Sequence, residues 1–241
     1  MDTQKMNFSA LTFLMHEVYA IINSSKVKLN DLANNNDVRV NDLLINEVLE
    51  VQSYVEQINL LLNYADIKQN PDSIDNILES DPIDLNLLKT FQKPNQYFKN
   101  LIKRKRLKYK VQADSNIPTV KGYAILHSIG NILLDNAIKY SPNDSDIECH
   151  LECMNNELII TMNNEGPFID AEELLEIRNI GVRGKNAVLT GRRGHGFGLD
   201  FLSEIIEKIH CGKFEISSTF NFHLDSIKYG TFTCRIVLPI S

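Results

Sequence analysis

Residues 191–202, GRRGHGFGLDFL, place Gly194, Gly196 and Gly198 at every second position directly ahead of an apolar run. Glycine lacks a Cβ, so such a loop lets the backbone approach a phosphate closely. The N-terminus of the following helix adds amide donors and positive partial charge. Glycine clusters also mark turns of many other kinds. The loop alone therefore leaves two interpretations open, a nucleotide-handling loop and a flexible turn into a helix.

Two earlier segments favour the nucleotide interpretation. NILLDNAIKYSP (131–142) falls in a long predicted helix, where spacings of three and four put three polar side chains on one face: Asn136, Lys139 and Tyr140. An amide oxygen suits a magnesium ion, and an ammonium group suits phosphate. NNEGPFID (163–170) follows a strand-like run, which puts Asn164 and Gly166 at the exit of that strand. Together the three segments predict a nucleotide site more strongly than any one of them.

The surrounding pattern predicts an α+β fold. A helix is expected over 84–105, although Pro94 should end or kink it, and a second over 123–140. Four runs read as strands: 107–113, 146–154, 157–164 and 230–239. Asn155-Asn156 stands where a hairpin turn is expected. This order predicts an α/β sandwich with helices on one face of a mixed, mostly antiparallel sheet.

The N-terminal part has a different pattern. Apolar residues recur at helical spacing from Leu11 to Leu32 and again from Val40 to Ala65, separated by a polar break, so we expect a helical hairpin. Two helices alone bury too little, and pairing of two copies into a four-helix bundle makes a homodimer the expected state. The predicted domains are a hairpin over 1–72, a linker over 73–82 and a second domain over 83–241.

Composition excludes several classes. The chain has 241 residues, 43% of them hydrophobic, which suits a folded protein. A formal net charge of −6 argues against a nucleic-acid partner, whose binding surface would be basic. No apolar run approaches the roughly 20 residues of a membrane span, and the N-terminus lacks a secretion pattern. The sequence therefore predicts no membrane span in this chain and a cytoplasmic location.

Taken together, these segments resemble the catalytic core of bacterial sensor histidine kinases. The C-terminal part looks like their GHKL-type ATP-binding domain, which belongs to an ATPase superfamily shared with gyrase, a heat-shock chaperone and mismatch-repair proteins. LMHEVYAIIN (14–23) and YVEQINLLLNYADIKQN (54–70) resemble the dimerisation and phosphoacceptor hairpin of the same kinases. The resemblance covers the chain from about residue 10 to the end.

The resemblance implies roles for individual residues. Asn136 matches the asparagine that coordinates Mg2+ between the ATP phosphates, and Lys139 and Tyr140 match positions that contact phosphate and the flank of the nucleotide. Asn164 and Gly166 match the first glycine box, which recognises adenine. The second glycine box, which closes over the triphosphate, is matched by a further set: Arg193, Gly194, Gly196, Gly198 and Leu199. Residues 172–193 would form a mobile lid whose cations meet phosphate charge: Arg183, Lys185, Arg192 and Arg193.

His16 is the expected phosphate acceptor. At 100° per residue it lies about 200° from the apolar position Leu14, on the exposed side of its helix. A neutral imidazole can attack through one nitrogen while a neighbouring carboxylate accepts the proton of the other. The pair His16-Glu17 matches the His-Glu pair of the family, which implies that Glu17 is that carboxylate.

Some positions depart from the family pattern. Asn164 replaces an aspartate that accepts a hydrogen bond from adenine, although an amide oxygen can also accept that bond. Phe168 replaces a glycine and either narrows the pocket or packs against the lid. Ile132 stands where hydrolytic relatives carry a glutamate that activates water, which argues against efficient ATP hydrolysis. Ala20 replaces a polar residue that positions water, so phosphatase activity is expected to be weak or absent.

The sequence therefore predicts an ATP-dependent protein histidine autokinase of a two-component system. It would transfer the γ-phosphoryl group of ATP to His16 and then to an aspartate on the receiver domain of a response regulator, with a separate sensor protein as one source of the signal. The alternative is a phosphotransfer or scaffold protein of the same architecture with a degenerate nucleotide site. A basic cluster over 99–110 is interpreted as a solvated helix end rather than a docking surface.

Overall fold

The computed structural model describes residues 42–179, 181–192 and 196–240, with side chains from residue 55 onward except that of Gln57. The described residues fall into two compact units that divide between Ser73 and Ile74. The first predicted helix, from Leu11 to Leu32, lies outside the described residues. The second corresponds to α2 (Asp42–Gln69), so the helical hairpin and the homodimer stay predictions.

Helix α2 carries two apolar stripes along the part whose side chains are described. Leu60, Tyr64 and Ile67 are buried at a spacing of four and three residues, as one helix face requires. Ile58 and Leu61 form a neighbouring stripe and are 42% and 41% exposed. Among the described residues, no helix is both long and apolar enough to cross a membrane.

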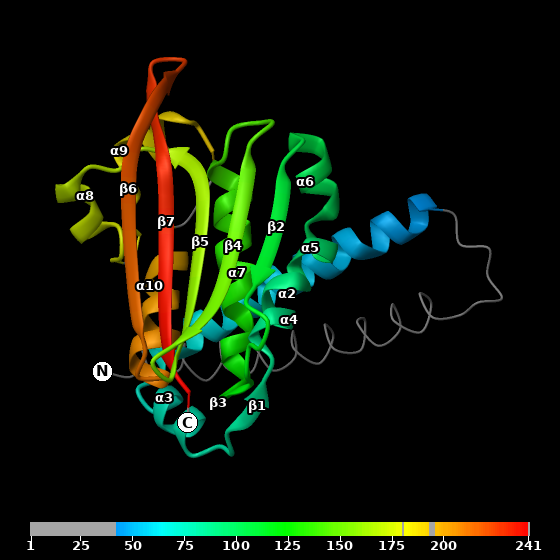
Figure 1. The fold of residues 1–241 in the computed structure, drawn as a ribbon, viewed down its shortest axis with the longest axis vertical. Coiled ribbons are helices and arrows are strands. Elements are labelled where there is room, and N and C mark those ends of the chain that lie inside the picture. The colour runs from blue at the N-terminus through cyan, green and yellow to red at the C-terminus, as the bar shows by residue number, and fades with distance from the viewer. Residues whose placement is uncertain (1–41, 180, 193–195, 241) are drawn as a thin grey trace, which may run out of the picture. The chain divides into compact units, whose positions relative to one another are not determined.

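The second unit is built on a five-stranded sheet with the order β2-β4-β5-β7-β6 (Figure 1). The strands are β2 (Lys108–Ala113), β4 (Asp146–Met154), β5 (Glu157–Pro167), β6 (Lys213–Leu224) and β7 (Ile227–Pro239). The β2–β4 pair is parallel and the other three pairs are antiparallel. The prediction of a mixed, mostly antiparallel sheet is thus confirmed.

Two tight turns connect the antiparallel hairpins. Asn155 and Asn156 have φ values of 52° and 63°, and Asp225 and Ser226 have values of 49° and 65°. Two successive positive φ values define the turn whose twist matches that of paired strands, and Asn and Asp tolerate this conformation best. The first turn was predicted from the sequence. The second lies in a hairpin longer than the single strand predicted over 230–239.

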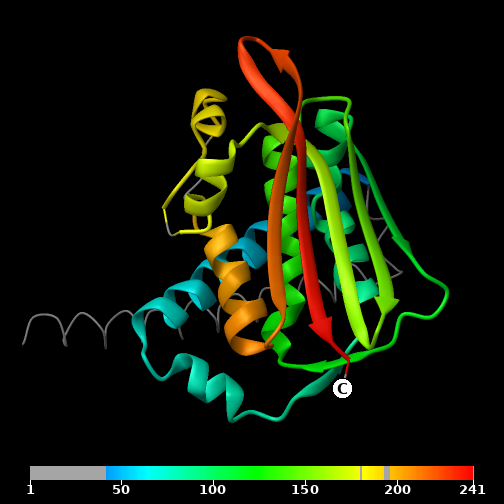
Figure 2. The same cartoon turned by 60° about the vertical axis from the view of Figure 1, so that its left-hand side comes forward.

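Helices cover one face of this sheet (Figure 2). The principal helices there are α7 (Ser128–Tyr140), which follows a 3-10 turn at Ala124–His127, and α10 (Gly198–Ser203), which continues as a π-helix, η2 (Glu204–Ile209). The core between the two layers contains fully buried side chains from both: Ile129, Leu134, Phe201, Ile147, Leu151 and Ile160. Along β4 these alternate with solvent-facing residues, as strand geometry requires.

The single helix predicted over 84–105 is wrong. Its start belongs to β1 (Ile83–Leu85), which pairs with β3 (Val120–Gly122), and the rest forms α4 (Leu87–Gln92), α5 (Pro94–Tyr97) and α6 (Lys99–Lys105). Asn86 caps α4 by accepting a hydrogen bond from the Lys89 amide at 3.0 Å. Pro94 lacks an amide proton, so it starts α5 instead of continuing α4.

Candidate functional site

Helix α7 meets the glycine loop at Asn136. A Cβ on Gly198 would lie 2.9 Å from the Asn136 Nδ2 atom and 3.4 Å from the Cγ2 atom of Ile132. The first distance is closer than carbon and nitrogen atoms tolerate, so only glycine fits here without displacing Asn136. Two motifs that lie far apart in the sequence are therefore in direct contact, as the nucleotide interpretation requires.

Gly196 packs against the backbone of the lid. Its φ of 67° favours glycine, and a Cβ at this position would lie 2.8 Å from the carbonyl carbon of Gly181 and the carbonyl oxygen of Val182. The Gly181 amide donates a hydrogen bond to the Gly196 carbonyl at 3.0 Å. The glycine loop and the middle of the lid thus fix one another. Two other predicted site residues, Arg193 and Gly194, lie outside the described residues.

Asn164 lies inside β5, paired with Ile147 of β4 and Phe232 of β7, so the prediction that it follows the strand is wrong: β5 continues to Pro167. Its side-chain amide has a defined orientation. Only 7% of the residue is exposed, and its Nδ2 atom donates to the Ser141 hydroxyl at 3.2 Å and to the Glu165 carbonyl at 2.8 Å. The Oδ1 atom has no hydrogen-bond partner among the described residues. A Cβ on Gly166 would lie 3.4 Å from Nδ2, so this glycine leaves room for the side chain. Asn164 therefore presents an acceptor.

Lys139 and Tyr140 occupy the last turn of α7. The Lys139 ammonium donates to the Asp135 carboxylate at 3.0 Å, one turn back on the same helix. The guanidinium of Arg183 lies 6.0 Å from the centre of the Tyr140 ring, within cation–π range. Leu199 lies in the first turn of α10, next to Gly198. The predicted cofactor-binding residues that the structure describes thus gather around α7, the start of α10 and the last part of β5.

Two cations cap the C-terminus of α7. The Lys105 ammonium donates to the Ile138 and Ser141 carbonyls at 2.5 Å each, and Arg192 donates to the carbonyls of Lys139 and Ser141. The last carbonyls of a helix lack partners in the helix and carry partial negative charge, which cations offset. Burial, followed by the charges of Arg192 and Arg104, lowers the pKa of Lys105 from 10.5 to about 8.

Sequence reasoning missed Ser141 and Lys105 as parts of this site. Ser141 links three elements, because its hydroxyl accepts from Asn164 while its carbonyl accepts from Lys105 and Arg192. Its position directly after Tyr140 in NAIKYSP was visible in the sequence. The role of Lys105 depends on how α6 packs beside α7, and no local pattern shows it.

The predicted lid over 172–193 contains two short helices, α8 (Ala171–Glu176) and α9 (Lys185–Leu189). Glu173 completes a capping box with Asp170 and also accepts the Lys185 amide at 2.6 Å, which joins the two helices. Arg183 donates to the Arg192 carbonyl at 2.7 Å. The side chains of Arg183 and Arg192 are thus both bound to main-chain carbonyls, while Lys185 is exposed.

Phe168 packs on the long β6–β7 hairpin. Its ring meets the Phe220 ring edge to face, with centres 5.8 Å apart, and its amide donates to the Lys228 carbonyl at 2.8 Å. Its own carbonyl accepts from the Asn186 side chain of α9 at 2.7 Å. Phe168, which replaces the glycine of the family pattern, therefore packs against the hairpin through its ring. The main chain of Phe168 holds the lid through the bond from Asn186.

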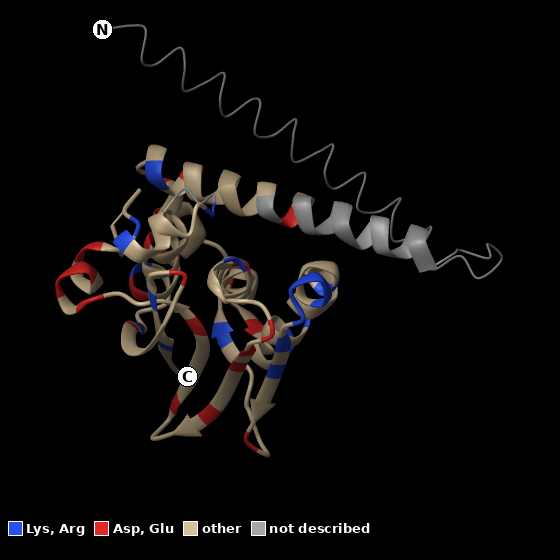
Figure 3. Cartoon of the chain, turned by 90° about the horizontal axis from the view of Figure 1, so that it is seen from above, with Lys and Arg blue, Asp and Glu red and all other residues tan. Residues whose placement is uncertain are grey.

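The basic cluster over 99–110 is only partly a solvated helix end. Figure 3 shows its Lys and Arg residues on α6 and the adjoining strand. Lys105 is part-buried against α7, as described above, and Arg106 forms an ion pair with Asp144. Lys110 lies 3.2 Å from the Asp146 carboxylate. Several of these cations therefore have partners within the domain.

Comparison with known proteins agrees with this arrangement. Residues 123–240 match the family described as histidine kinase-, DNA gyrase B-, and HSP90-like ATPase. Sensor protein KdpD of Clostridium acetobutylicum is 32% identical over 124 residues, which cover 52% of this chain and 13% of that protein. The match thus spans about an eighth of that relative.

Solved structures show the same fold at low sequence identity. The catalytic domain of histidine kinase ThkA is 19% identical, with a TM-score of 0.54 over 66% of this chain and 96% of its own. Full-length ShkA in complex with AMPPNP is 14% identical, with a TM-score of 0.56 over 97% of this chain and 47% of its own. Residues 123–240 thus match an ATPase domain of this family, and the chain resembles the ATP-binding core of sensor histidine kinases.

Proposed function

We propose that this chain is an ATP-dependent protein histidine autokinase of a two-component system. It would transfer the γ-phosphoryl group of ATP to His16 and then to an aspartate on the receiver domain of a response regulator. The observation that supports ATP binding is the contact of Asn136 with Gly198. His16 and Glu17 lie outside the described residues, and their roles rest on the sequence resemblance.

The residues around α7 suit a magnesium-bound triphosphate. Bound ATP would supply the transferable phosphoryl group, and Mg2+ would neutralise charge on its phosphates. The amide oxygen of Asn136 is a suitable ligand for that ion. The backbone of Gly196 and Gly198 would line the phosphates, and Lys139 would exchange its ion pair with Asp135 for one with phosphate.

Asn164 gives the proposed site a preference for adenine. Its Nδ2 atom is held by Ser141 and Glu165, so the free Oδ1 atom can only accept a hydrogen bond. The exocyclic amine of adenine is a donor and satisfies it, whereas the carbonyl oxygen at the same position of guanine would face another acceptor. The site should therefore bind ATP more tightly than GTP.

Ile132 disfavours hydrolysis as the outcome. It is 4% exposed, and its Cγ2 atom approaches the position of Gly198. An aliphatic side chain cannot take a proton from water, so a bound triphosphate would lack this general base. The phosphoryl group would instead pass to His16, whose second nitrogen gives its proton to Glu17. Phosphatase activity toward the regulator is expected to be weak, because Ala20 cannot position water.

The lid must rearrange before its arginines can meet phosphate. In this structure Arg192 binds the carbonyls of Lys139 and Ser141, and Arg183 binds the carbonyls of Ala187 and Arg192. We infer that nucleotide binding releases Arg192 from the end of α7. Lys105 also donates to the Ser141 carbonyl, so that group keeps a partner after the release.

A homodimer is the proposed assembly. The exposed stripe of Ile58 and Leu61 on α2 gives a second copy an apolar surface to cover. We propose a cytoplasmic reaction because it consumes ATP, and a signal that arrives through a separate sensor protein or through the hairpin. Analytical ultracentrifugation of the full chain tests the dimer, and a monomer at micromolar concentration would exclude it.

Labelled ATP tests the kinase assignment directly. Incubation of the full chain with γ-labelled ATP and Mg2+ should give an acid-labile, alkali-stable phosphoprotein, and His16→Ala should abolish the label. His223→Ala is the matched control, because His223 is an exposed histidine on the β6–β7 hairpin and should leave the label intact. Label that persists in His16→Ala rejects the assignment.

A scaffold with a degenerate nucleotide site is the second candidate. The replacements at Asn164 and Phe168 favour it, whereas the close fit of Gly198 on Asn136 opposes it. Titration calorimetry with a non-hydrolysable ATP analogue and Mg2+ separates the two functions. Saturable binding of one equivalent supports the kinase, and no heat of binding at millimolar nucleotide supports the scaffold.

A further inference from the structure

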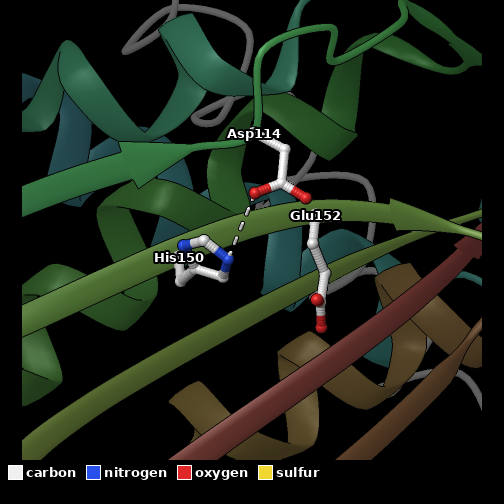
Figure 4. Close-up of side chains that lie close together, drawn as sticks. All are labelled: Asp114, His150 and Glu152. Carbon is white, nitrogen blue, oxygen red and sulfur yellow. Dashed lines mark ion pairs between the residues drawn. The ribbon is translucent and has the colours of Figure 1, made fainter.

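A cluster of metal-ligating side chains lies on the outer face of the sheet. Asp114 directly follows β2, and its amide donates to the Leu151 carbonyl of β4 at 3.0 Å. His150 and Glu152 flank Leu151, whose side chain is fully buried. Because successive side chains of a strand point to opposite faces, both point away from the core, and Asp114 approaches them from the neighbouring strand (Figure 4).

The distances suit a common metal ion. One ligand atom from each of the three residues lies within 4.8 Å of the others, and the Nε2 atom of His150 is 3.7 Å from the Asp114 carboxylate. Zinc bonds of about 2.0–2.2 Å in tetrahedral geometry place ligand atoms roughly 3.3–3.6 Å apart. The side chains of His150 and Asp114 are 46% and 56% exposed, so their rotation would close the remaining difference without backbone movement.

The charges at this cluster also favour a cation. The two preceding acids on this face of β4 have lysine partners: Lys110 lies 3.2 Å from Asp146 and 3.9 Å from Glu148. Within the described part of the chain, neither Asp114 nor Glu152 has a Lys or Arg partner. Two neighbouring carboxylates repel one another, and a divalent ion would offset that repulsion.

We propose that Asp114, His150 and Glu152 bind a Zn2+ ion, with water as the fourth ligand. One imidazole nitrogen and two carboxylate oxygens suit zinc, whereas Mg2+ prefers an octahedron of oxygens. The ion would clamp the end of the edge strand β2 to β4. This site is separate from the nucleotide site, because Ile147, near the other end of β4, is the residue that pairs with Asn164.

Titration calorimetry of the chelator-treated full chain with a zinc salt alone tests the proposal. Wild type should bind one equivalent, and Asp114→Asn, Glu152→Gln and His150→Ala should each weaken binding at least about tenfold, since even outer-shell changes cost this much. His223→Ala is the control and should bind like wild type. Circular dichroism checks that each variant is folded.

Two further measurements exclude other sites. Zinc could bind the exposed thiols Cys153 and Cys211, so a Cys153→Ser, Cys211→Ser variant should retain full affinity. Substitution of cobalt for zinc should give the visible bands of a tetrahedral nitrogen and oxygen site, without a sulfur charge-transfer band. The proposal is wrong if zinc shows no saturable binding at 100 times the protein concentration. It is also wrong if the three ligand substitutions leave zinc binding unchanged.

Discussion

Gly198→Ala should weaken nucleotide binding while leaving the free energy of unfolding nearly unchanged. The added Cβ would lie 2.9 Å from the Asn136 Nδ2 atom, which is the free end of a flexible side chain. Asn136 can therefore turn away at small cost, and the substitution removes a glycine from the first turn of α10, which reduces the entropy of the unfolded chain. These effects oppose each other, so the free energy of unfolding should stay within about 1 kcal/mol of wild type.

Binding of magnesium and nucleotide should respond much more strongly. A displaced Asn136 would lose the contact with the metal that we propose for it, and an interaction with a charged group contributes about 1.5–3 kcal/mol. At about 1.4 kcal/mol for each tenfold change, the Kd for an ATP analogue with Mg2+ should rise roughly 10- to 150-fold. The change should appear only with Mg2+ present, because Asn136 is expected to act through the ion.

Gly184→Ala provides the matched control. A Cβ on Gly184 would lie 3.5 Å from its nearest neighbour, an ordinary contact, and its φ of −59° suits alanine. Titration calorimetry should give this variant the affinity of wild type, and urea unfolding should give all three proteins similar midpoints. Equal affinity of the two variants for nucleotide would refute the placement of Asn136 at the metal.

Three further predictions follow from contacts around the site. Asn164→Leu should weaken ATP binding at least about tenfold and remove the preference for ATP over GTP, as measured by calorimetry, because the acceptor for the adenine amine is lost. Arg192→Gln should raise the pKa of Lys105 above about 8, measured by NMR of the side chain, since one of the charges that lower it is removed; burial remains and keeps the pKa below 10.5. Burial lowers the pKa of His210, so the unfolded chain takes up a proton at this residue before the folded chain does as the pH falls below 6.5. The free energy of unfolding should therefore decrease as the pH falls below 6.5, and His210→Asn should make this decrease smaller, as measured by urea unfolding at several pH values.

Local patterns predicted much of the sheet and the principal helix. The run 146–154 alternates apolar and polar residues and forms β4 over those residues, and Asn155-Asn156 makes the expected turn. These features depend on neighbours in the sequence, so the sequence suffices. The close approach of Asn136 and Gly198 was also expected from the sequence, because a single nucleotide site predicted from both motifs requires them to lie side by side.

Features that depend on packing between distant segments were missed. Residues 84–105 have a helical apolar pattern, yet β1 pairs with β3 and Pro94 divides the rest. The outer half of β6 is largely exposed, so this strand shows no clear alternation there and was not predicted. Lys105 and Arg192 meet at the end of α7 only because α6 and the lid pack there.

A crystal structure of the chain with Mg2+ and a non-hydrolysable ATP analogue would show whether α7, β5 and the glycine loop hold the nucleotide as proposed. We expect metal density at the Asn136 amide oxygen, phosphates along the backbone of Gly196 and Gly198, and the adenine amine at the Oδ1 atom of Asn164. Nucleotide bound elsewhere, or the Phe168 ring in the place of the base, would contradict it.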